Sequence, residues 1–521
     1  MRSDFELRPS FVIQISSFDI PLFIRRKEAS TAMTTTALPL LRDFGDRFSP
    51  IVVKELRQGL RTRFFTAALL LFHALIILLL ASVLLDAPVQ TVNGIFWGIA
   101  GLMLLVVLPL RAFNELNAES SDGTLDMLTL TSIPSFRILS GKWVALFSQS
   151  LLVAGSLLPY MVARYFFGGV EILREVAALI VLVLASGIIT AALLAFSSQK
   201  SVLLRIALAV GVGFAATPLG LFTAFLVVSN EGDSLIREFL TLAAWEKWSL
   251  CGGIVALACY IIWFFLALGA SRIAPPSENQ STRKRMIVLA AHATLTLIGW
   301  LLGWFGNEAE YAMWAFIPLV PLTMLAAMDV LTEDPPLYPT AVAVLAGKGR
   351  AGSLLGRILH PGWPSGVPYS AILVVMTLSI LVGVIMRSSF SRWDDFTLFM
   401  LLLQLAVFPP VLISLNRSNR FANWWVVQVS MIAAGMLLAV FCEGMGARDL
   451  GGVGALAPVT TLFAAEIVGY SSRDGVLQIG CVCALLWTLA AFVRAFLNFP
   501  TYTALENEAR QLNPPRHDAA E

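Results

Sequence analysis

The segment FFTAALLLFHALIILLLASVLL, residues 64–85, decides the class of this protein. It contains nine Leu, two Ile, three Phe and one Val, and its one ionisable side chain is His73. Each strong apolar residue near the bilayer centre favours membrane insertion by about 0.3–0.6 kcal/mol. A run of this length is also sufficient to cross the hydrocarbon core as a helix. The segment is therefore predicted to be a membrane span.

Similar segments recur along the whole chain, so the predicted fold class is all-α, a polytopic bundle of about twelve transmembrane helices. Hydrophobic residues make up 57% of the sequence and charged residues 13%, whereas soluble domains carry about 25% charged residues. Residues 451–470 are apolar but are interrupted by Pro458 and Glu466, which favours a re-entrant or interfacial element. The predicted spans are 64–85, 95–113, 143–167, 175–196, 203–228, 249–270, 287–305, 311–330, 369–387, 396–415, 424–442 and 476–497.

The distribution of basic residues predicts the orientation. Loops rich in Lys and Arg stay on the cytoplasmic side of a membrane. Placing the N-terminus inside puts most of the 36 basic residues on the inner side, including Arg283, Lys284 and Arg285. We therefore expect a multi-pass protein of the inner (plasma) membrane with both termini in the cytoplasm.

A linker-like stretch, APPSENQST, divides the chain after six spans. The expected organisation is a poorly structured cytoplasmic arm at 1–48, a six-span unit at 49–270, a cytoplasmic linker at 271–286, a second transmembrane bundle at 287–498 and a cytoplasmic tail at 499–521. Met33 lies just before the organised part and is an alternative start.

The segment PIVVKELRQGLRTR, residues 50–63, precedes the first span. Its apolar residues fall on one side of a helical projection and its basic residues on the other, which is typical of a helix lying along the membrane surface. The alternative is a basic flank that anchors the first span. The residues assigned to the interface helix are Pro50, Lys54, Glu55, Leu56, Arg57, Leu60 and Arg61.

The loop after the second span, Arg111–Trp143, carries more leucines than a connection needs. Thr124 is expected to cap a short helix with Leu125 and Leu128 on one face. Pro134 then opens a helix that continues into the third span. The predicted result is a small apolar knob able to transmit a push from a soluble motor to the membrane helices.

This loop resembles the cytoplasmic loop of ABC-2 type transporter permeases. The shared pattern is E-x-x-x-G-T-L-x-x-L-x-L-T-x-x-P-x-x-x-x-x-x-G-K, formed here by Glu119, Gly123, Thr124, Leu125, Leu128, Leu130, Thr131, Pro134, Gly141 and Lys142. The preceding P-I-V-x-K-E-L-R, Pro50–Arg57, is similar to the interface helix of that family. The resemblance covers residues 49–270.

The resemblance implies a permease subunit of an ABC exporter whose loop 114–142 docks on a separate ATPase subunit. ATP and Mg²⁺ would be bound by that partner, and no cofactor, metal or catalytic residue is expected on this chain. Expected partners are the ATPase, membrane lipid, and a second copy or a second permease. The resemblance also implies an external helix within 230–248, for which Asp233 or Ser234 is the expected N-cap.

The second half departs from the family pattern, because it has no second copy of the loop motif. Two arrangements stay open: a fused pseudo-dimer with one degenerate half, or a subunit with additional spans that still dimerises. The substrate is not readable from the sequence.

Several other functions are disfavoured by missing patterns. The chain has no G-x-x-x-x-G-K-[ST] motif for binding nucleotide phosphates, no C-x-x-C pair, and no massed basic face for nucleic acid. A membrane-embedded transferase would need clustered carboxylates, whereas Asp86 is isolated and Asp394-Asp395 has no acidic companion. The alternatives that stay open are a secondary transporter and a scaffold for assembling an envelope enzyme.

Polar groups within the predicted spans are functional candidates, because they are costly in a membrane. His73, His292, Asp329 and Glu466 lie one per segment. Four arginines near span ends are expected to extend to the interface: Arg164, Arg205, Arg387 and Arg494. The pair Gly299-x-x-x-Gly303 favours a close helix crossing.

Overall fold

Twelve helices in the described part of the chain are long and apolar enough to cross a membrane. The computed structural model describes residues 50–512 except 84, 86, 122–132, 168–170, 200, 276–278, 306–308, 387–392, 414–418, 447–452 and 468–469. Helices dominate this part of the chain, and no strand occurs in it. The predicted class, an all-α polytopic bundle, is confirmed.

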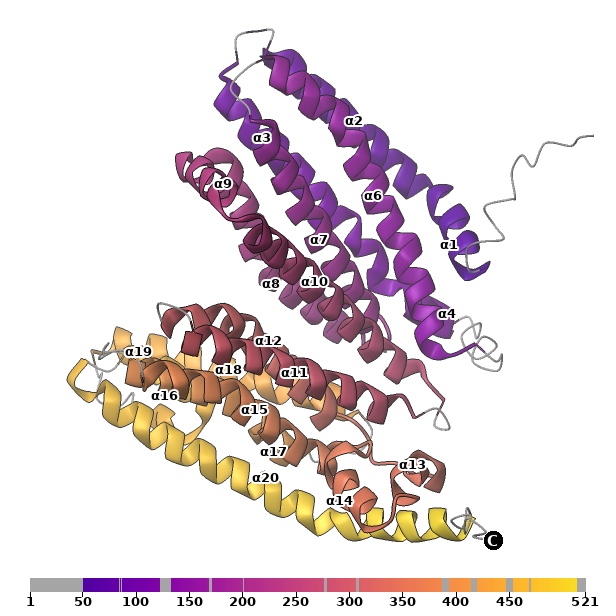
Figure 1. The fold of residues 1–521 in the computed structure, drawn as a ribbon, viewed down its shortest axis with the longest axis vertical. Helices are drawn as coiled ribbons and strands as arrows, with labels where there is room; N and C mark the ends of the chain where they lie inside the picture. The colour runs from indigo at the N-terminus through magenta and orange to yellow at the C-terminus, as the bar shows by residue number, and fades with distance from the viewer. Residues whose placement is uncertain are drawn as a thin grey trace, which may run out of the picture. The chain divides into compact units, whose positions relative to one another are not determined.

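The first half begins with the short helix α1 and then contains six spans (Figure 1). The second span is not a uniform α-helix, because it passes through a π-helical segment, η2, and a 3-10 segment, η3, before α4. The elements are α1 (Pro50–Leu60), α2 (Arg63–Val83), α3 (Val89–Gly101), η2 (Leu102–Val107), η3 (Pro109–Asn114), α4 (Glu115–Ser121), α6 (Ser135–Phe167), α7 (Ile172–Phe196), α8 (Val202–Val228), α9 (Asn230–Thr241) and α10 (Ala244–Ile273).

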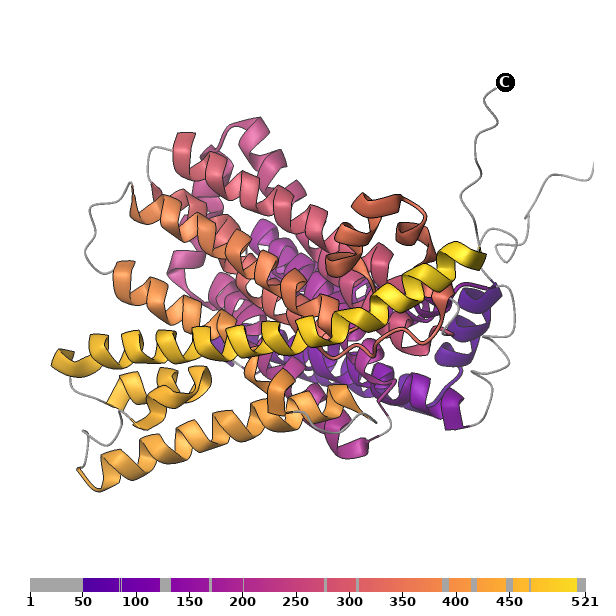
Figure 2. The same ribbon diagram turned by 90° about the horizontal axis from the view of Figure 1, so that it is seen from below.

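The second half contains six more spans and several short helices. Its last helix, α20, runs as one continuous element beside α15 and α13 (Figure 2). The elements are α11 (Gln280–Phe305), η4 (Ala309–Ala312), α12 (Met313–Leu331), η5 (Pro339–Ala341), α13 (Ala343–Ala346), α14 (Gly349–Leu359), α15 (Trp363–Ile385), α16 (Trp393–Leu405), α17 (Pro409–Ile413), α18 (Arg420–Gly444), α19 (Pro458–Ile467) and α20 (Tyr470–Leu512).

Three regions differ from a plain series of spans. The described part of residues 451–470 holds a 3-10 turn at 453–456 and the ten-residue α19, which is too short to cross a bilayer and packs on α18 and α20. The Pro- and Gly-rich stretch 332–362 folds into η5, α13 and α14. Helix α20 continues without a break past residue 498, where a tail was expected to begin. The expected arm 1–48 lies outside the described residues.

The hydrophobic core joins the two halves. Phe196 of α7 lies 6.3 Å from Phe421 of α18, measured between ring centroids, and both belong to a buried cluster that includes Phe264 and Trp363. A second cluster, which includes Phe96 and Leu157, fills the space among α2, α3, α6 and α7. The predicted bundles 49–270 and 287–498 therefore share one core.

Candidate functional site

A buried lysine joins three elements of the first half. Lys142 lies in the second turn of α6, and its side chain is 2% exposed. Its Nζ atom lies 2.7 Å from Glu119 Oε1, 3.2 Å from Glu115 Oε1 and 3.2 Å from Glu55 Oε1. These carboxylates come from α4 and α1, so one ammonium group connects the interface helix, the end of the second span and the start of the third.

Glycine explains how α1 comes close enough to reach this lysine. A Cβ atom at Gly141 would lie 3.0 Å from Ile51 Cγ2, and one at Gly59 would lie 2.5 Å from Gln149 Nε2. Both positions therefore lie where α1 and α6 touch. A larger residue at Gly141 would press against Ile51, whereas the amide end of the Gln149 side chain could turn away from one at Gly59. The Gly-Lys pair thus has two roles: Gly141 admits α1, and Lys142 then pairs with Glu55.

Helix α4 presents two carboxylates at spacing four, which places them on one face of a helix. The face is held in position by the backbone N–H of Leu116, which donates to Ser197 Oγ at the end of α7 (3.2 Å). Glu115 and Glu119 therefore both point at Lys142, and α4 is fixed to the fourth span as well as to the third.

Carboxylates outnumber cations around Lys142, and a small polar cavity lies beside it. The cavity has a volume of about 110 Å³ and is lined by Glu55, Arg111, Glu115, Lys142 and Gln149, among others. Arg111 Nη2 donates to the carbonyl of Gly59 at 3.4 Å. The Lys142 cluster is therefore not tightly packed on this side.

The segment predicted to be an interface helix is helical, as α1, but part of its apolar face has different contacts from those predicted. Lys54 and Arg57 are exposed, as the projection predicted. Ile51 and Val52, however, lie against Gly141 of α6, so this part of the apolar face packs on protein and not on lipid. Glu55, which the sequence placed in the helix without a role, is the residue that ties it to Lys142.

The structure describes four of the ten residues of the loop motif. It brings Glu119, Gly141 and Lys142 together, and Pro134 is exposed just before α6. Glu115 was missed by the sequence analysis, although its spacing of four from Glu119 was a signal. The six motif residues outside the described part of the chain are Gly123, Thr124, Leu125, Leu128, Leu130 and Thr131.

A second polar network lies at the start of α11. Arg285 Nη2 lies 2.7 Å from Glu333 Oε2, and Lys284 Nζ lies 2.5 Å from Asp329 Oδ2. Arg272 of α10 adds a longer contact to Asp329, 3.8 Å. In this network three cations share two carboxylates, whereas three carboxylates surround the ammonium group of Lys142.

Two groups of this network lie outside the spans and have shifted pKa values. Burial alone would raise the pKa of Glu333, but Arg285 and Lys284 outweigh it, and the pKa lies below its ordinary value. Burial lowers the pKa of His360, and Arg357 and Arg285 add to this, against the opposing effect of Glu506. Nε2 of His360 lies 3.1 Å from Glu506 Oε1. Glu333 is therefore charged and His360 neutral near pH 7.

The prediction that arginines near span ends extend to the interface is wrong for the three that the structure describes. Arg164 is 3% exposed and pairs with Glu175, Nη1 to Oε2, at 2.8 Å. Arg205 donates to the side chain of Asn114. Arg494 Nη1 donates to the carbonyl of Leu412 at 2.7 Å. Each cation has found a partner inside the bundle; Arg387 lies outside the described residues.

The remaining predicted features are placed as follows. The helix expected within 230–248 is present as α9, but its N-cap is Ser229, whose Oγ accepts from Gly232 N at 3.1 Å. A Cβ atom at Gly299 would lie 2.8 Å from Ile380, so α11 and α15 do cross closely there. His292, a buried residue of α11, contacts Thr323 Oγ1 at 3.3 Å.

Comparison with known proteins does not assign the chain to a family. No protein-family model, curated protein or solved structure matches the chain significantly. Among the residues that the structure describes, no group of three or more His, Cys, Asp or Glu side chains is arranged to hold a metal ion; the centre of the Glu55–Glu115–Glu119 group is taken by Lys142 itself. What is established is a multi-pass, all-helical membrane protein with a buried ion cluster at one end of its first half.

Proposed function

We propose that this chain is the membrane-spanning permease subunit of an ABC transporter, exporting a substrate with ATP hydrolysed by a separate subunit. The proposal starts from the resemblance of residues 49–270 to ABC-2 permeases. The observation that carries it is the position of Lys142, the last residue of the loop motif, between Glu55 of the interface helix and Glu119 of the same motif. Two motifs noticed separately in the sequence thus meet at one atom.

The cluster offers a path for force from a soluble partner. Segment 122–132 connects α4 to α6, so a partner pushing on it acts on Glu119 and Lys142 from both sides of their contact. Helix α6 has 33 residues and is therefore about 50 Å long at 1.5 Å per residue. Because it is longer than the hydrocarbon core of about 30 Å, a displacement at its first turn is carried across the whole bilayer.

The second span supplies a bending point on the same path. Between α3 and α4 the backbone is π-helical at Leu102–Val107 and 3-10 at Pro109–Asn114. Pro109 has no N–H to donate, and π-helical segments are weaker than α-helix and are frequent at functional sites. A push on α4 would therefore bend this span near Leu108 before it disturbed the packed part of α3.

The proposed orientation places α1, α4 and the start of α6 in the cytoplasm, as the excess of basic residues on that side favours. The chain has no motif for binding nucleotide phosphates. In this proposal the partner therefore hydrolyses ATP, and this chain responds by changing its conformation. The inner membrane is the expected location.

The test is co-purification of the full-length chain with an ATPase encoded beside it. Wild type should bind the ATPase and stimulate ATP hydrolysis, and Leu125→Asp/Leu128→Asp should lose both, because charges replace the proposed docking leucines. The matched control is Leu235→Asp/Leu240→Asp on α9, where both leucines are exposed and lie on the outer side in the proposed orientation. This control should bind normally.

Two outcomes would reject the proposal. If the loop variant still binds and stimulates the ATPase, the docking assignment is wrong. If the α9 variant loses binding while the loop variant keeps it, the orientation is reversed.

A further inference from the structure

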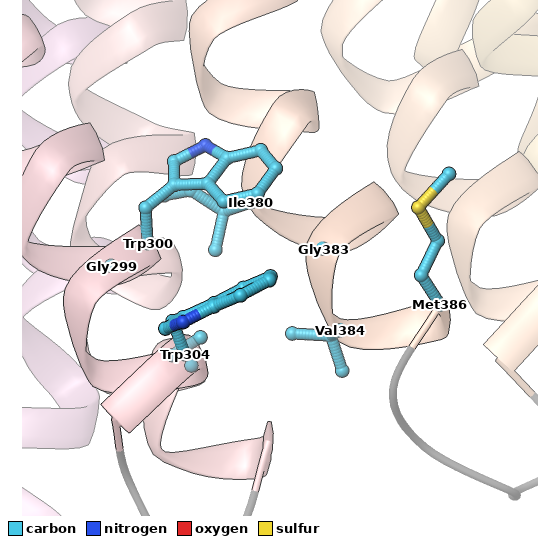
Figure 3. A pocket seen from close by; sticks show the side chains of 9 residues that line it. Gly299, Trp300, Trp304, Ile380, Gly383, Val384 and Met386 are labelled. Atoms are coloured by element: carbon cyan, nitrogen blue, oxygen red, sulfur yellow. The ribbon is translucent and has the colours of Figure 1, made fainter.

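An apolar groove lies between α11 and α15, at the ends of these spans that are remote from Arg285. Its volume is about 430 Å³, within the range of roughly 300–1,000 Å³ that is usual for small-molecule sites. Figure 3 shows the indole rings of Trp300 and Trp304 lying between the backbones at Gly299 and Gly383. The two tryptophans therefore form the sides of the groove.

Glycine and a hydrogen bond define its shape. A Cβ atom at Gly383 would lie 3.4 Å from the ring of Trp300, so the indole rests over a position that has no side chain. Nε1 of Trp300 donates to Ser379 Oγ at 3.2 Å. This hydrogen bond to α15 holds the ring of Trp300 in place, so that its apolar faces line the groove.

The surroundings of the groove decide the kind of ligand. Among the residues that the structure describes, no ionisable side chain lines it. Met386 is 83% exposed and Trp304 65% exposed, and Leu301 and Phe305 beside them are also exposed. Exposed apolar side chains on membrane spans contact the hydrocarbon of the bilayer, so the groove is continuous with the lipid-facing surface.

We infer that this groove binds one acyl chain of a bilayer phospholipid. Trp304 lies in the last turn of α11, and tryptophans at span ends mark the level of the lipid headgroups. The chain enters at that level and runs between the indole rings of Trp300 and Trp304 towards Ile380. The inference concerns the second half and does not depend on the proposed transport function.

The test uses the full-length protein in lipid nanodiscs that contain a phosphatidylcholine with a photoactivatable diazirine on one acyl chain. After irradiation, labelled peptides are located by mass spectrometry. Labelling should concentrate on residues 299–305 and 380–386. Gly383→Leu fills the groove and should reduce labelling there by about tenfold, the factor expected from the loss of about two buried methylene contacts.

Gly475→Leu is the matched control. Gly475 is an exposed glycine in a span of the same half, and a Cβ atom there would meet no atom within 4 Å; this variant should label as wild type does. Trp304→Ala removes one side of the groove at an exposed position, so a folded protein with reduced labelling at 380–386 is expected.

Three results would overturn the inference. Labelling spread evenly over all exposed spans would mean that the groove holds lipid no better than the rest of the surface. Unchanged labelling in both Gly383→Leu and Trp304→Ala would mean that the groove is not the labelled place. Labelling that avoids 299–305 and 380–386 while other exposed spans are labelled would mean that lipid does not reach the groove, as when a second copy of the chain covers it.

Discussion

Two spans of this protein begin near a buried cation, and the surroundings of the two cations differ. Lys142 of α6 contacts three carboxylates and, within the described residues, no backbone carbonyl of another element. Arg285 of α11 contacts one carboxylate, Glu333, and also donates to the carbonyls of Ile358 (3.1 Å) and Gly362 (2.9 Å) and to Ser365 Oγ (2.9 Å). One cation is shared among side chains, and the other is fixed to the main chain.

This difference indicates two mechanical roles. An ammonium group on a flexible stem attracts carboxylates from many directions, whereas a planar guanidinium requires its acceptors in fixed places. The turn at Gly362 meets this requirement with φ +106°, and a Cβ atom there would lie 2.8 Å from Pro335 Cα. The Lys142 cluster is therefore suited to a joint that moves, and the Arg285 network to a rigid support.

The largest effect is expected from Arg285→Met. The substitution leaves Glu333 without its main counter-charge and removes donors from three further acceptors, which should cost about 3–5 kcal/mol of stability. Arg285→Lys should recover little, because an ammonium group cannot reach all of these acceptors. The measurement is the apparent melting temperature of the purified full-length protein in detergent. An Arg285→Lys variant as stable as wild type would refute the rigid-support interpretation.

Lys142→Met should cost less, about 1–3 kcal/mol. Glu55, Glu115 and Glu119 are each partly exposed, so without the lysine they can turn towards water. The double variant Lys142→Met/Glu119→Gln should recover part of the loss, because it removes one of three repelling carboxylates.

The matched pair on the other side is Arg285→Met/Glu333→Gln, which should recover little, because the hydrogen bonds from the guanidinium to the carbonyls of Ile358 and Gly362 stay lost. The measurement is the melting temperature of each double variant minus that of Lys142→Met or Arg285→Met, respectively. The difference between these two recoveries measures how far the Lys142 cluster and the Arg285 network differ. If both double variants recovered the same share of the lost stability, the Lys142 cluster could not be distinguished as a joint from the Arg285 network as a support.

The sequence was sufficient for the spans but not for the segment between α12 and α15. Runs such as 64–85 can form only one structure in a bilayer, because every backbone group must bond within the segment. Local sequence patterns predict a loop for the Pro- and Gly-rich stretch 332–362. It folds because Val342 and Ala346 pack against Tyr502 of α20, a contact between residues more than 150 positions apart that no local pattern contains.

The ion cluster was predictable in part. Lys142 and Glu119 belong to one sequence motif, so the sequence was sufficient to select both as candidate site residues. The pairing of Lys142 with Glu55 was not predictable, because it depends on how closely α1 approaches Gly141. Arg164 was misjudged because its partner, Glu175, lies on the next helix. A basic and an acidic residue at the facing ends of consecutive spans was the signal that could have revealed this pair.

The smallest expected effect is a change of stability with pH, and it is expected only in the network around Arg285. His360 is buried, and its pKa lies below the ordinary 6.5. Between the lowered value and about 6.5, the unfolded chain binds a proton that the folded chain does not, so stability falls as the pH drops below about 6.5. The lowered pKa of Glu333 gives a contribution to stability that is lost only below its ordinary 4.5, so between these values Glu333 does not add to the effect of His360.

Melting temperatures at about pH 7.5 and about pH 5.5 test this, since the interval spans the window in which the linkage acts. Wild type should be less stable at the lower pH, and His360→Gln should show a smaller difference because its side chain does not titrate. Glu506, Arg357 and Arg285 face the same imidazole and are unchanged in this variant, so they cannot account for the change. No histidine of the described residues contacts the carboxylates around Lys142. A pH dependence that persists in full in His360→Gln would therefore have to arise elsewhere, and the contrast between a titrating support and a non-titrating joint would be lost.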